Sequence, residues 1–269
     1  MTSQRAAIYD RGGRDVYIYN HSDIISEVVT ENDIYCADIG RNGTIAVATK
    51  STGYASEVQV MDKNGKVKYI WYSSDETVNN VAVSNNGRRI VVSTVSVSGG
   101  AYKSKVYVFK YSSADPLYVL EYDNTIIYSI DCISSSRFTV VTDESVDFIK
   151  WKNGERKQNT NPYTLNIFRH KQNSWGIAVI GNKSSSSIIA YNKSGEKISS
   201  FDFDGAVSDV TMCKDNIYII SDGYMYCFDL DGNLLADKLN VSGYSRIFAQ
   251  NASTAICAGN FGLDKFNID

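Results

Sequence analysis

Two stretches of the sequence, Ile45-Ala-Val-Ala-Thr49 and Ile90-Val-Val-Ser-Thr94, share one pattern, a short apolar run that ends in a polar residue. The same pattern, ending in a small or polar residue, recurs through the chain. Its central positions are Ile8, Val47, Val92, Val140, Val179, Ile219 and Cys257. Successive central positions lie 38 to 48 residues apart. Each is expected to be buried in the middle of a strand and to face a neighbouring blade. A repeat of about 40 residues is typical of β-propeller blades.

The residues between the copies predict the rest of each unit. A second apolar stretch follows about ten residues later, such as Val58-Gln-Val-Met61, and often runs into a tight turn such as Asp62-Lys-Asn-Gly65. Asn-Gly or Asp-Gly between apolar runs supplies the positive φ that a hairpin turn needs. Two more strands, such as Val67-Lys-Tyr-Ile70 and Val81-Ala-Val83, complete a unit. The sequence therefore predicts an all-β fold, a seven-bladed β-propeller of four-stranded antiparallel blades. A β-sandwich is the alternative.

The two ends of the chain lack parts of this unit. The chain enters at the second strand of a blade and leaves after a third strand, so the first and last blades are expected to be incomplete. We expect a segment of about 20–30 residues or more upstream of Met1 to supply the missing strands. No linker or charge block interrupts the repeat, so residues 1–269 are expected to form a single propeller domain. Unpaired blade edges would favour self-association.

Composition narrows the possible partners. The chain has 19 Tyr and 2 Pro, which favours strands. Its formal net charge of −3 argues against nucleic acid as a partner. No apolar run approaches the roughly 20 residues of a membrane span, and no signal peptide follows Met1.

Cysteines and tryptophans are expected to be structural. Five cysteines, an odd number without C-x-x-C spacing, give little support to a metal or redox site. Cys227 and Cys257 occupy positions that are Val or Ile in other copies, so free, buried thiols are expected. Trp71, Trp151 and Trp175 are expected to pack between blades, with stacking on a ligand as the alternative.

No catalytic motif or cofactor fingerprint is present. His21 and His170, the two histidines, lie in different repeats, so no catalytic residue, metal ligand or cofactor is predicted. Asp229-Leu-Asp231 resembles part of a calcium loop, but a hairpin turn explains the same residues and is preferred.

One set of residues is a candidate site. Loops after second strands and loops after fourth strands emerge on the same face of a propeller, and many of them carry acidic side chains. The predicted ligand-binding residues on this acidic face are Asp10, Asp143, Asp222, Asp33, Asp75 and Asp123. Further acidic residues in the same loops are Glu31, Glu76, Asp202 and Asp204. Clustered negative charge attracts a small cationic ligand or a basic protein; an ordinary solvated rim is the alternative.

The motif Tyr9-Asp10-Arg11-Gly12-Gly13, followed by Val16-Tyr-Ile-Tyr19, resembles an uncharacterised bacterial β-propeller family, a domain of unknown function found mainly in Gram-positive anaerobes. More distantly, the chain is similar to quinoprotein-like and YVTN-type propellers. The resemblance implies an extracellular or cell-surface protein held by an upstream membrane anchor; a cytoplasmic location stays open. The family has no catalytic residues to carry over.

These observations favour a non-catalytic propeller, a binding or scaffold module at the bacterial cell surface. The alternative is a propeller hydrolase or lyase that uses carboxylates and a metal ion. That alternative requires His, Asp or Glu side chains from several blades to converge on one point.

Overall fold

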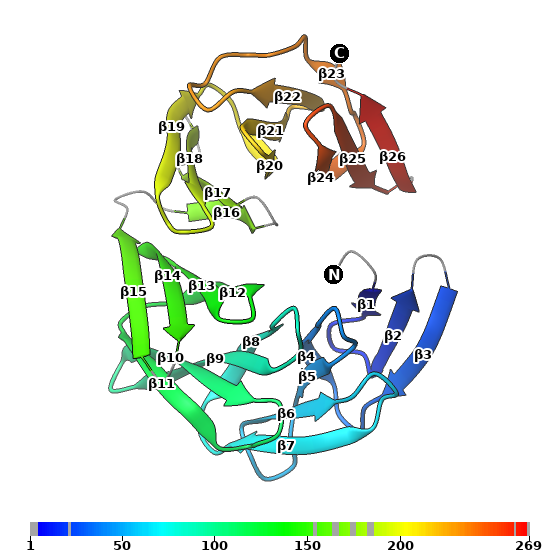
Figure 1. Ribbon diagram of the computed structural model, residues 1–269, viewed down its shortest axis with the longest axis vertical. Coiled ribbons are helices and arrows are strands. Elements are labelled where there is room, and N and C mark those ends of the chain that lie inside the picture. The colour runs from blue at the N-terminus through cyan, green and yellow to red at the C-terminus, as the bar shows by residue number, and fades with distance from the viewer. Residues whose placement is uncertain are drawn as a thin grey trace. The chain divides into compact units, whose positions relative to one another are not determined.

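The computed structural model describes residues 5–20, 23–152, 155–162, 167–172, 176–181, 186–260 and 262–267. Every element in these ranges is a β-strand, so none of the described residues belongs to a helix that could cross a membrane. The strands form antiparallel sheets, shown in Figure 1. The chain divides into two compact units, Met1–Asn161 and Pro162–Asp269, which are described separately. The single-domain expectation therefore stays a prediction.

The first unit contains four sheets, whose strands follow one another in chain order. The first sheet consists of β1 (Arg5–Tyr9), β2 (Asp15–Asn20) and β3 (Asp23–Val29). The second consists of β4 (Ile34–Ile39), β5 (Ile45–Thr49), β6 (Ser56–Met61) and β7 (Val67–Ser73). The third consists of β8 (Thr77–Val83), β9 (Arg89–Ser98), β10 (Ala101–Lys110) and β11 (Pro116–Asp123). The fourth consists of β12 (Ile127–Ser134), β13 (Arg137–Thr142), β14 (Ser145–Lys152) and β15 (Glu155–Pro162).

The second unit contains three sheets of the same kind. The fifth sheet of the chain consists of β16 (Ile167–Gln172), β17 (Gly176–Gly181), β18 (Ser186–Asn192) and β19 (Lys197–Phe203). The sixth consists of β20 (Val207–Cys213), β21 (Asn216–Ser221), β22 (Tyr224–Phe228) and the short β23 (Leu239–Asn240). The seventh consists of β24 (Tyr244–Asn251), β25 (Thr254–Gly259) and β26 (Gly262–Asn267).

Four consecutive antiparallel strands in one sheet are the unit of a β-propeller, and the all-β propeller predicted from the sequence is confirmed. The expectation of seven four-stranded blades is not supported. Among the described residues, five sheets have four strands, and the first and seventh sheets have three.

The repeat aligns with the structure, because six of the seven central positions lie on the second strand of their sheet; the seventh, Ile8, lies on β1, the first strand of a three-stranded sheet. Their neighbours also correspond: Val92 pairs with Val81 on one side, and Ile219 pairs with Val210. Five central residues are fully buried, with an exposed fraction of 0%: Val47, Val92, Val140, Ile219 and Cys257. Each of these five packs into the cluster that joins its own sheet to the preceding one. Burial of the apolar strands between sheets is the main stabilising term of the fold.

Ile8 is the exception, and the prediction that it is buried is wrong. Its side chain is 54% exposed. The central residues of the other copies face the preceding sheet. By the same rule, Ile8 faces away from the second sheet, and no described sheet of the first unit precedes the first sheet and covers this side chain. Ala7 and Tyr9, on the opposite face of β1, do pack against the second sheet. The side chain of Val179 lies outside the described residues.

The hairpin turns form as predicted. Gly65 has φ +77°, which favours glycine, and its N–H donates to the carbonyl of Asp62 over 2.9 Å. Asp229 begins another turn of the same kind, and its carboxylate accepts hydrogen bonds from the N–H groups of Asp231 and Asn233 at 2.9 and 2.8 Å. The Asp229 carboxylate is thus occupied by its own turn, and the hairpin interpretation is confirmed.

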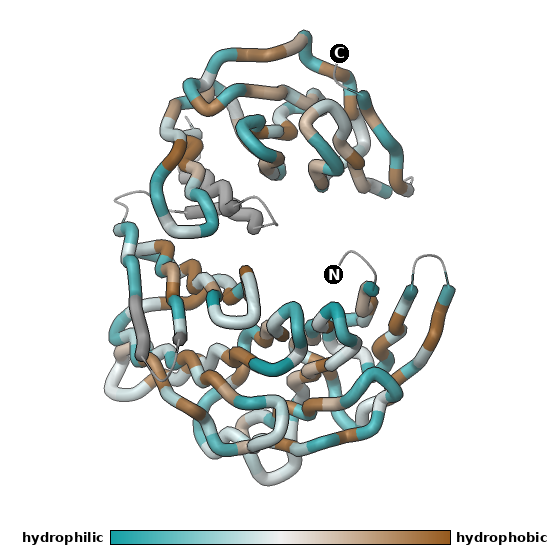
Figure 2. Tube along the Cα trace, viewed as in Figure 1, coloured by the Kyte–Doolittle hydropathy of each residue, from teal (hydrophilic) through white to brown (hydrophobic). Residues whose placement is uncertain are grey.

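Apolar residues concentrate in the strands, whereas the connecting loops are more hydrophilic (Figure 2). All five cysteines are free, as predicted. Trp71 packs against Tyr107 and Phe109 of the next sheet, with ring centroids 4.9 and 5.3 Å away. The inter-blade role expected for Trp71 is confirmed; Trp175 lies outside the described residues.

Candidate functional site

The acidic loops of the first unit lie at one end of its sheets. In an up-and-down antiparallel sheet, the loop after the second strand and the loop after the fourth strand leave from the same end. This end is called the loop face below and comprises residues 10–14, 30–33, 50–55, 74–76, 99–100, 124–126 and 143–144. Five of the six predicted residues lie on it or at its border: Asp10, Asp33, Asp75, Asp123 and Asp143. Asp222 lies in the second unit, in the turn after β21.

Asp33 forms ion pairs that join the first two sheets. Its Oδ2 lies 2.6 Å from Nζ of Lys50, and its Oδ1 lies 3.8 Å from Nε of Arg14. The hydrogen bond and the charge of Lys50 hold the pKa of Asp33 below its usual range. Asp33 is therefore ionised at neutral pH, but its charge is largely neutralised by its neighbours.

Asp143 and Asp222 serve local structure. The carboxylate of Asp143 accepts the N–H of Ile126 at 2.9 Å and so ties the start of β12 to the end of β13. Asp222 is exposed and adopts φ +49° in the β21–β22 turn. It borders a shallow depression of the second unit that Ser208 and Arg246 also line.

Asp10, Asp75 and Asp123 remain the candidates for binding. All three are exposed, and no described side chain makes an ion pair with any of them within 4.0 Å. They lie on three separate segments: Asp10 in the β1–β2 loop, Asp75 in the connection from β7 to β8, and Asp123 at the end of β11. Such an arrangement can attract a basic surface by long-range electrostatics, but it does not form a compact metal site.

A second set of carboxylates, buried beneath the loop face, was largely missed by the sequence analysis. Glu57, Glu76 and Asp147 are only 7%, 4% and 1% exposed. Each belongs to a different sheet of the first unit and accepts hydrogen bonds from several side chains. The signal available in the sequence was a Ser or Thr near each acid, but burial depends on neighbouring strands, and the tyrosine donors to Glu76 and Asp147 are 31 and 25 residues away in the chain.

Glu76 is the member of this set that the sequence analysis placed on the acidic face. Its carboxylate accepts hydrogen bonds from Thr94 at 2.7 Å and Tyr107 at 2.8 Å, and it pairs with Lys105. Burial by itself would raise the pKa of Glu76, but the bonds from these three partners hold it below its ordinary value. Glu76 is a structural carboxylate and is not available to a ligand.

Asp147 and Glu57 differ from Glu76 because the described side chains that donate hydrogen bonds to them are all neutral. Asp147 accepts hydrogen bonds from the Tyr122 hydroxyl at 2.8 Å, Ser145 at 3.1 Å and Gln158 at 3.0 Å. Among the described residues, no Lys or Arg nitrogen lies within 4.0 Å of either carboxylate.

Two further carboxylates lie on the first strands of their sheets. Asp38 on β4 accepts the N–H of Val83 on β8 at 2.7 Å. Asp131, one position after the residue paired with the central Val140, corresponds to Asp38 in the fourth sheet. Burial, followed by the nearby charge of Asp38, raises the pKa of Asp131 to about 6. Asp38 and Asp131 are therefore two neighbouring titratable carboxyl groups inside the first unit.

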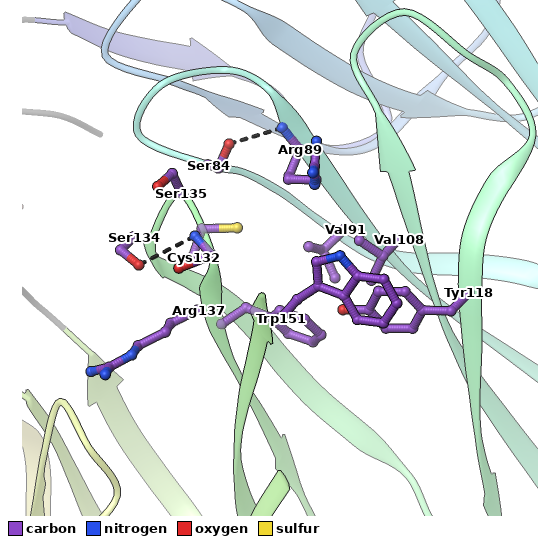
Figure 3. A pocket seen from close by; sticks show the side chains of 12 residues that line it. Ser84, Arg89, Val91, Val108, Tyr118, Cys132, Ser134, Ser135, Arg137 and Trp151 are labelled. Atoms are coloured by element: carbon purple, nitrogen blue, oxygen red, sulfur yellow. Dashed lines mark hydrogen bonds between the residues drawn. The ribbon is translucent and has the colours of Figure 1, made fainter. Parts of the chain in front are cut away.

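A pocket lies at the opposite end of the third and fourth sheets (Figure 3). Trp151 stacks on Tyr118, with centroids 4.1 Å apart and an interplanar angle of 18°, which confirms the packing role expected of Trp151. Figure 3 shows the Arg137 guanidinium pointing away from this stack. The enclosed space is about 10 Å³, enough for roughly one water molecule. The pocket is a seam between blades.

Metal chemistry finds no ready-made site in the part of the chain that the structure describes. Within it, no group of three or more His, Cys, Asp and Glu side chains is arranged to hold a metal ion. Of the two histidines, His21 and the side chain of His170 lie outside the described residues.

Comparison with known proteins agrees with the repeat and the Tyr-Asp-Arg-Gly-Gly motif. A profile of a family of unknown function, DUF5711, matches residues 1–258. The chain belongs to this family. No curated protein matches the chain.

Solved structures similar to the chain are β-propellers of low sequence identity. Dihydro-heme d1 dehydrogenase NirN, in complex with DHE, is 12% identical with a TM-score of 0.69; the match covers 98% of this chain and 61% of NirN. The C-terminal WD40 domain of Sif2 is 14% identical with a TM-score of 0.67, over 99% of this chain and 79% of the domain. BBS1N, in complex with ARL6DN, is 14% identical with a TM-score of 0.59, over 98% of this chain and 87% of BBS1N. At this identity the likeness shows the fold alone.

Proposed function

We propose that this protein is a non-catalytic binding module, a β-propeller whose loop face in the first unit binds a basic protein or peptide. The observation that carries the proposal is the set of exposed carboxylates Asp10, Asp75 and Asp123 at one end of the first unit's sheets, in a unit that also holds the buried carboxylates Glu57 and Asp147. Propeller proteins of similar fold include one solved with a protein partner, BBS1N with ARL6DN. Loops carried on a rigid scaffold are a frequent place for binding.

The electrostatics of the loop face set the expected mode of binding. Exposed carboxylates attract a basic partner over a distance comparable to the Debye length, about 8–10 Å in ordinary buffers. Binding should therefore weaken as salt is raised, and neutral or acidic peptides should not bind. No observation in the described residues favours the metal-dependent hydrolase.

The test uses a fluorescent peptide of alternating Lys and Ser, titrated with the protein at about 20 mM and about 150 mM salt. The triple variant Asp10→Asn, Asp75→Asn, Asp123→Asn should bind at least about tenfold more weakly at low salt, a difference of about 1.4 kcal/mol. The matched control changes Asp115, Asp215 and Asp231 to Asn, which removes the same charge from exposed positions at the other ends of their sheets. Equal weakening in the two triple variants would reduce the effect to net charge and overturn the proposal.

We also propose that the protein acts at the bacterial cell surface. The support is the resemblance of the Tyr9-to-Gly13 motif to a family of anchored propellers. Immunodetection on intact cells, before and after treatment with an added protease, tests the location. Protection from the protease in intact cells, with loss after lysis, would contradict it.

We further propose that each of the seven sheets is one blade of a single seven-bladed propeller. The support is the repeat of about 40 residues and the shared position of six of the seven central residues on second strands. A crystal structure of the full-length protein tests the count, and a ring with any other number of blades would overturn it.

A further inference from the structure

The second sheet carries an exposed aromatic pair on the loop face. Tyr54, in the loop between β5 and β6, is 48% exposed, and Tyr72, near the end of β7, is 44% exposed. Their rings stack with centroids 4.7 Å apart and an interplanar angle of 30°. Many of the described aromatic residues pack between sheets, such as Trp71 against Tyr107, whereas the stacked rings of Tyr54 and Tyr72 are open to solvent and can contact a ligand.

The buried carboxylate of Glu57 lies on the same face of this sheet. Tyr72 and Glu57 are directly opposite in the β6–β7 ladder, and Thr49 is opposite Glu57 on the other side. Residues opposite each other share a sheet face, with Cβ atoms about 4.5–5.5 Å apart. The aromatic pair therefore lies over a buried negative charge.

Neutral donors hold the Glu57 carboxylate in place. Gln59 donates to Oε1 at 2.8 Å, Thr49 donates to Oε1 at 3.2 Å, and Ser51 donates to Oε2 at 3.2 Å. By contrast, the buried acid Glu76, which directly precedes β8 of the next sheet, has Lys105 as its counter-charge. Among the described residues, no such cation lies within 4.0 Å of Glu57. A buried anion without a counter-ion favours the approach of a cation from outside.

Aromatic faces and a carboxylate together recognise one chemical class. The negative face of a tyrosine ring attracts ammonium and guanidinium groups, and the carboxylate adds direct charge attraction. The chain uses this chemistry internally, since Nζ of Lys238 lies 4.3 Å from the centroid of the Tyr224 ring.

We propose that Tyr54, Tyr72 and Glu57 form a subsite for a lysine-like alkylammonium side chain of the basic partner. The inference rests on the proposed function and deepens it, because it names the group that the loop face reads. The alkyl stem lies along the tyrosine rings, and the ammonium group points toward the carboxylate of Glu57.

The experiment uses n-butylammonium chloride, a mimic of the lysine side chain, as the probe. The tyrosine rings are labelled with ¹³C and followed by NMR, with Tyr54→Leu and Tyr72→Leu used for assignment. The ring signals of Tyr54 and Tyr72 should shift in a saturable manner. The signal of Tyr102, which is 50% exposed on the β9–β10 hairpin, should stay in place. Matched titrations with n-butanol and with sodium chloride should leave all three rings unmoved.

Two variants connect the shifts to the named residues. Glu57→Gln removes the charge and keeps the shape, and should weaken butylammonium binding about tenfold, equal to about 1.4 kcal/mol. Tyr54→Leu should weaken binding about two- to fivefold, as expected for one cation–π contact, whereas Tyr102→Leu should have no effect. Rings that do not shift, or equal shifts with butanol, would overturn the subsite. If the Lys-Ser peptide binds but butylammonium does not move these rings, the subsite is wrong and the proposed function stands; the reverse result retains the subsite and removes the proposed function.

Discussion

Glu57 and Tyr72 lie directly opposite each other on β6 and β7, so that a buried carboxylate and an exposed ring share one sheet face. The same arrangement places the hydroxyls of Thr49 and Ser51 on the carboxylate from the second-strand side. The loop face of the first unit is thus built in two layers. Buried anions form the lower layer, and exposed aspartates and tyrosines form the upper layer.

The contrast between Ile219 and Ile8 gives a prediction for stability. Ile219 is 0% exposed and Ile8 is 54% exposed, although both occupy the central position of the repeat. Ile219→Ala should lower the free energy of unfolding by about 2–5 kcal/mol, because it leaves a cavity in a packed core. Ile8→Ala should change it by less than about 0.5 kcal/mol. Urea unfolding followed by circular dichroism measures both, and a large loss for Ile8→Ala would show that this face of the first sheet is covered.

The central positions of the repeat show which parts of the fold can be predicted from the sequence. The period and the second-strand alignment follow from local apolar runs and turn residues, which is why Val47, Val92, Val140, Ile219 and Cys257 are placed correctly. Ile8 is not, because burial depends on whether a neighbouring sheet is present and the pattern within one strand carries no such information. The length of the β9–β10 hairpin could not be predicted either: the strands run to Ser98 and resume at Ala101, although the Ser and Gly residues of this segment are typical of a loop.

The site was harder to predict than the fold. The acidic loops could be assigned to one end of the sheets by strand order alone. The burial of Glu57 and Asp147 could not, because their donors come from other strands; Tyr122, for example, is 25 residues from Asp147 in the chain. The ion pairing of Asp33 with Lys50 was also invisible to a count of charges.

The raised pKa of Asp131 predicts an unusual contribution to the pH dependence of stability. Burial raises this pKa from 3.8 to about 6, so the folded state binds the proton more tightly than the unfolded state. The stabilisation is fully present below about pH 4 and is lost as pH rises to about 6, by up to about 3 kcal/mol. Asp131→Asn should remove this pH dependence and be more stable than the wild type at pH 7. Urea midpoints measured from pH 4 to 7 check the sign, and parallel profiles for the two proteins would contradict it.

The ion pair of Glu76 with Lys105 predicts the opposite sign. The pKa of Glu76 is lowered in the folded state, so its stabilisation is present above about pH 4.5 and is lost as pH falls through the folded pKa. Lys105→Met leaves a buried carboxylate without its counter-charge and should cost about 2–4 kcal/mol at pH 7. Adding Glu76→Gln to Lys105→Met should recover part of that loss. A double variant whose loss equals the sum of the two single losses would show that the charges do not interact.

Binding of a basic partner at the loop face is tested most directly by a hydrogen-exchange footprint of the full-length protein with the Lys-Ser peptide at low salt. The loop face is predicted to be protected, above all at residues 50–55 and 74–76, while the turns at residues 62–66 and 85–88, at the other end of the same sheets, exchange unchanged. The protection should disappear in the Asp10, Asp75, Asp123 triple variant and persist in its matched control. Protection confined to the turns at the other end, or spread evenly over both ends, would contradict the account.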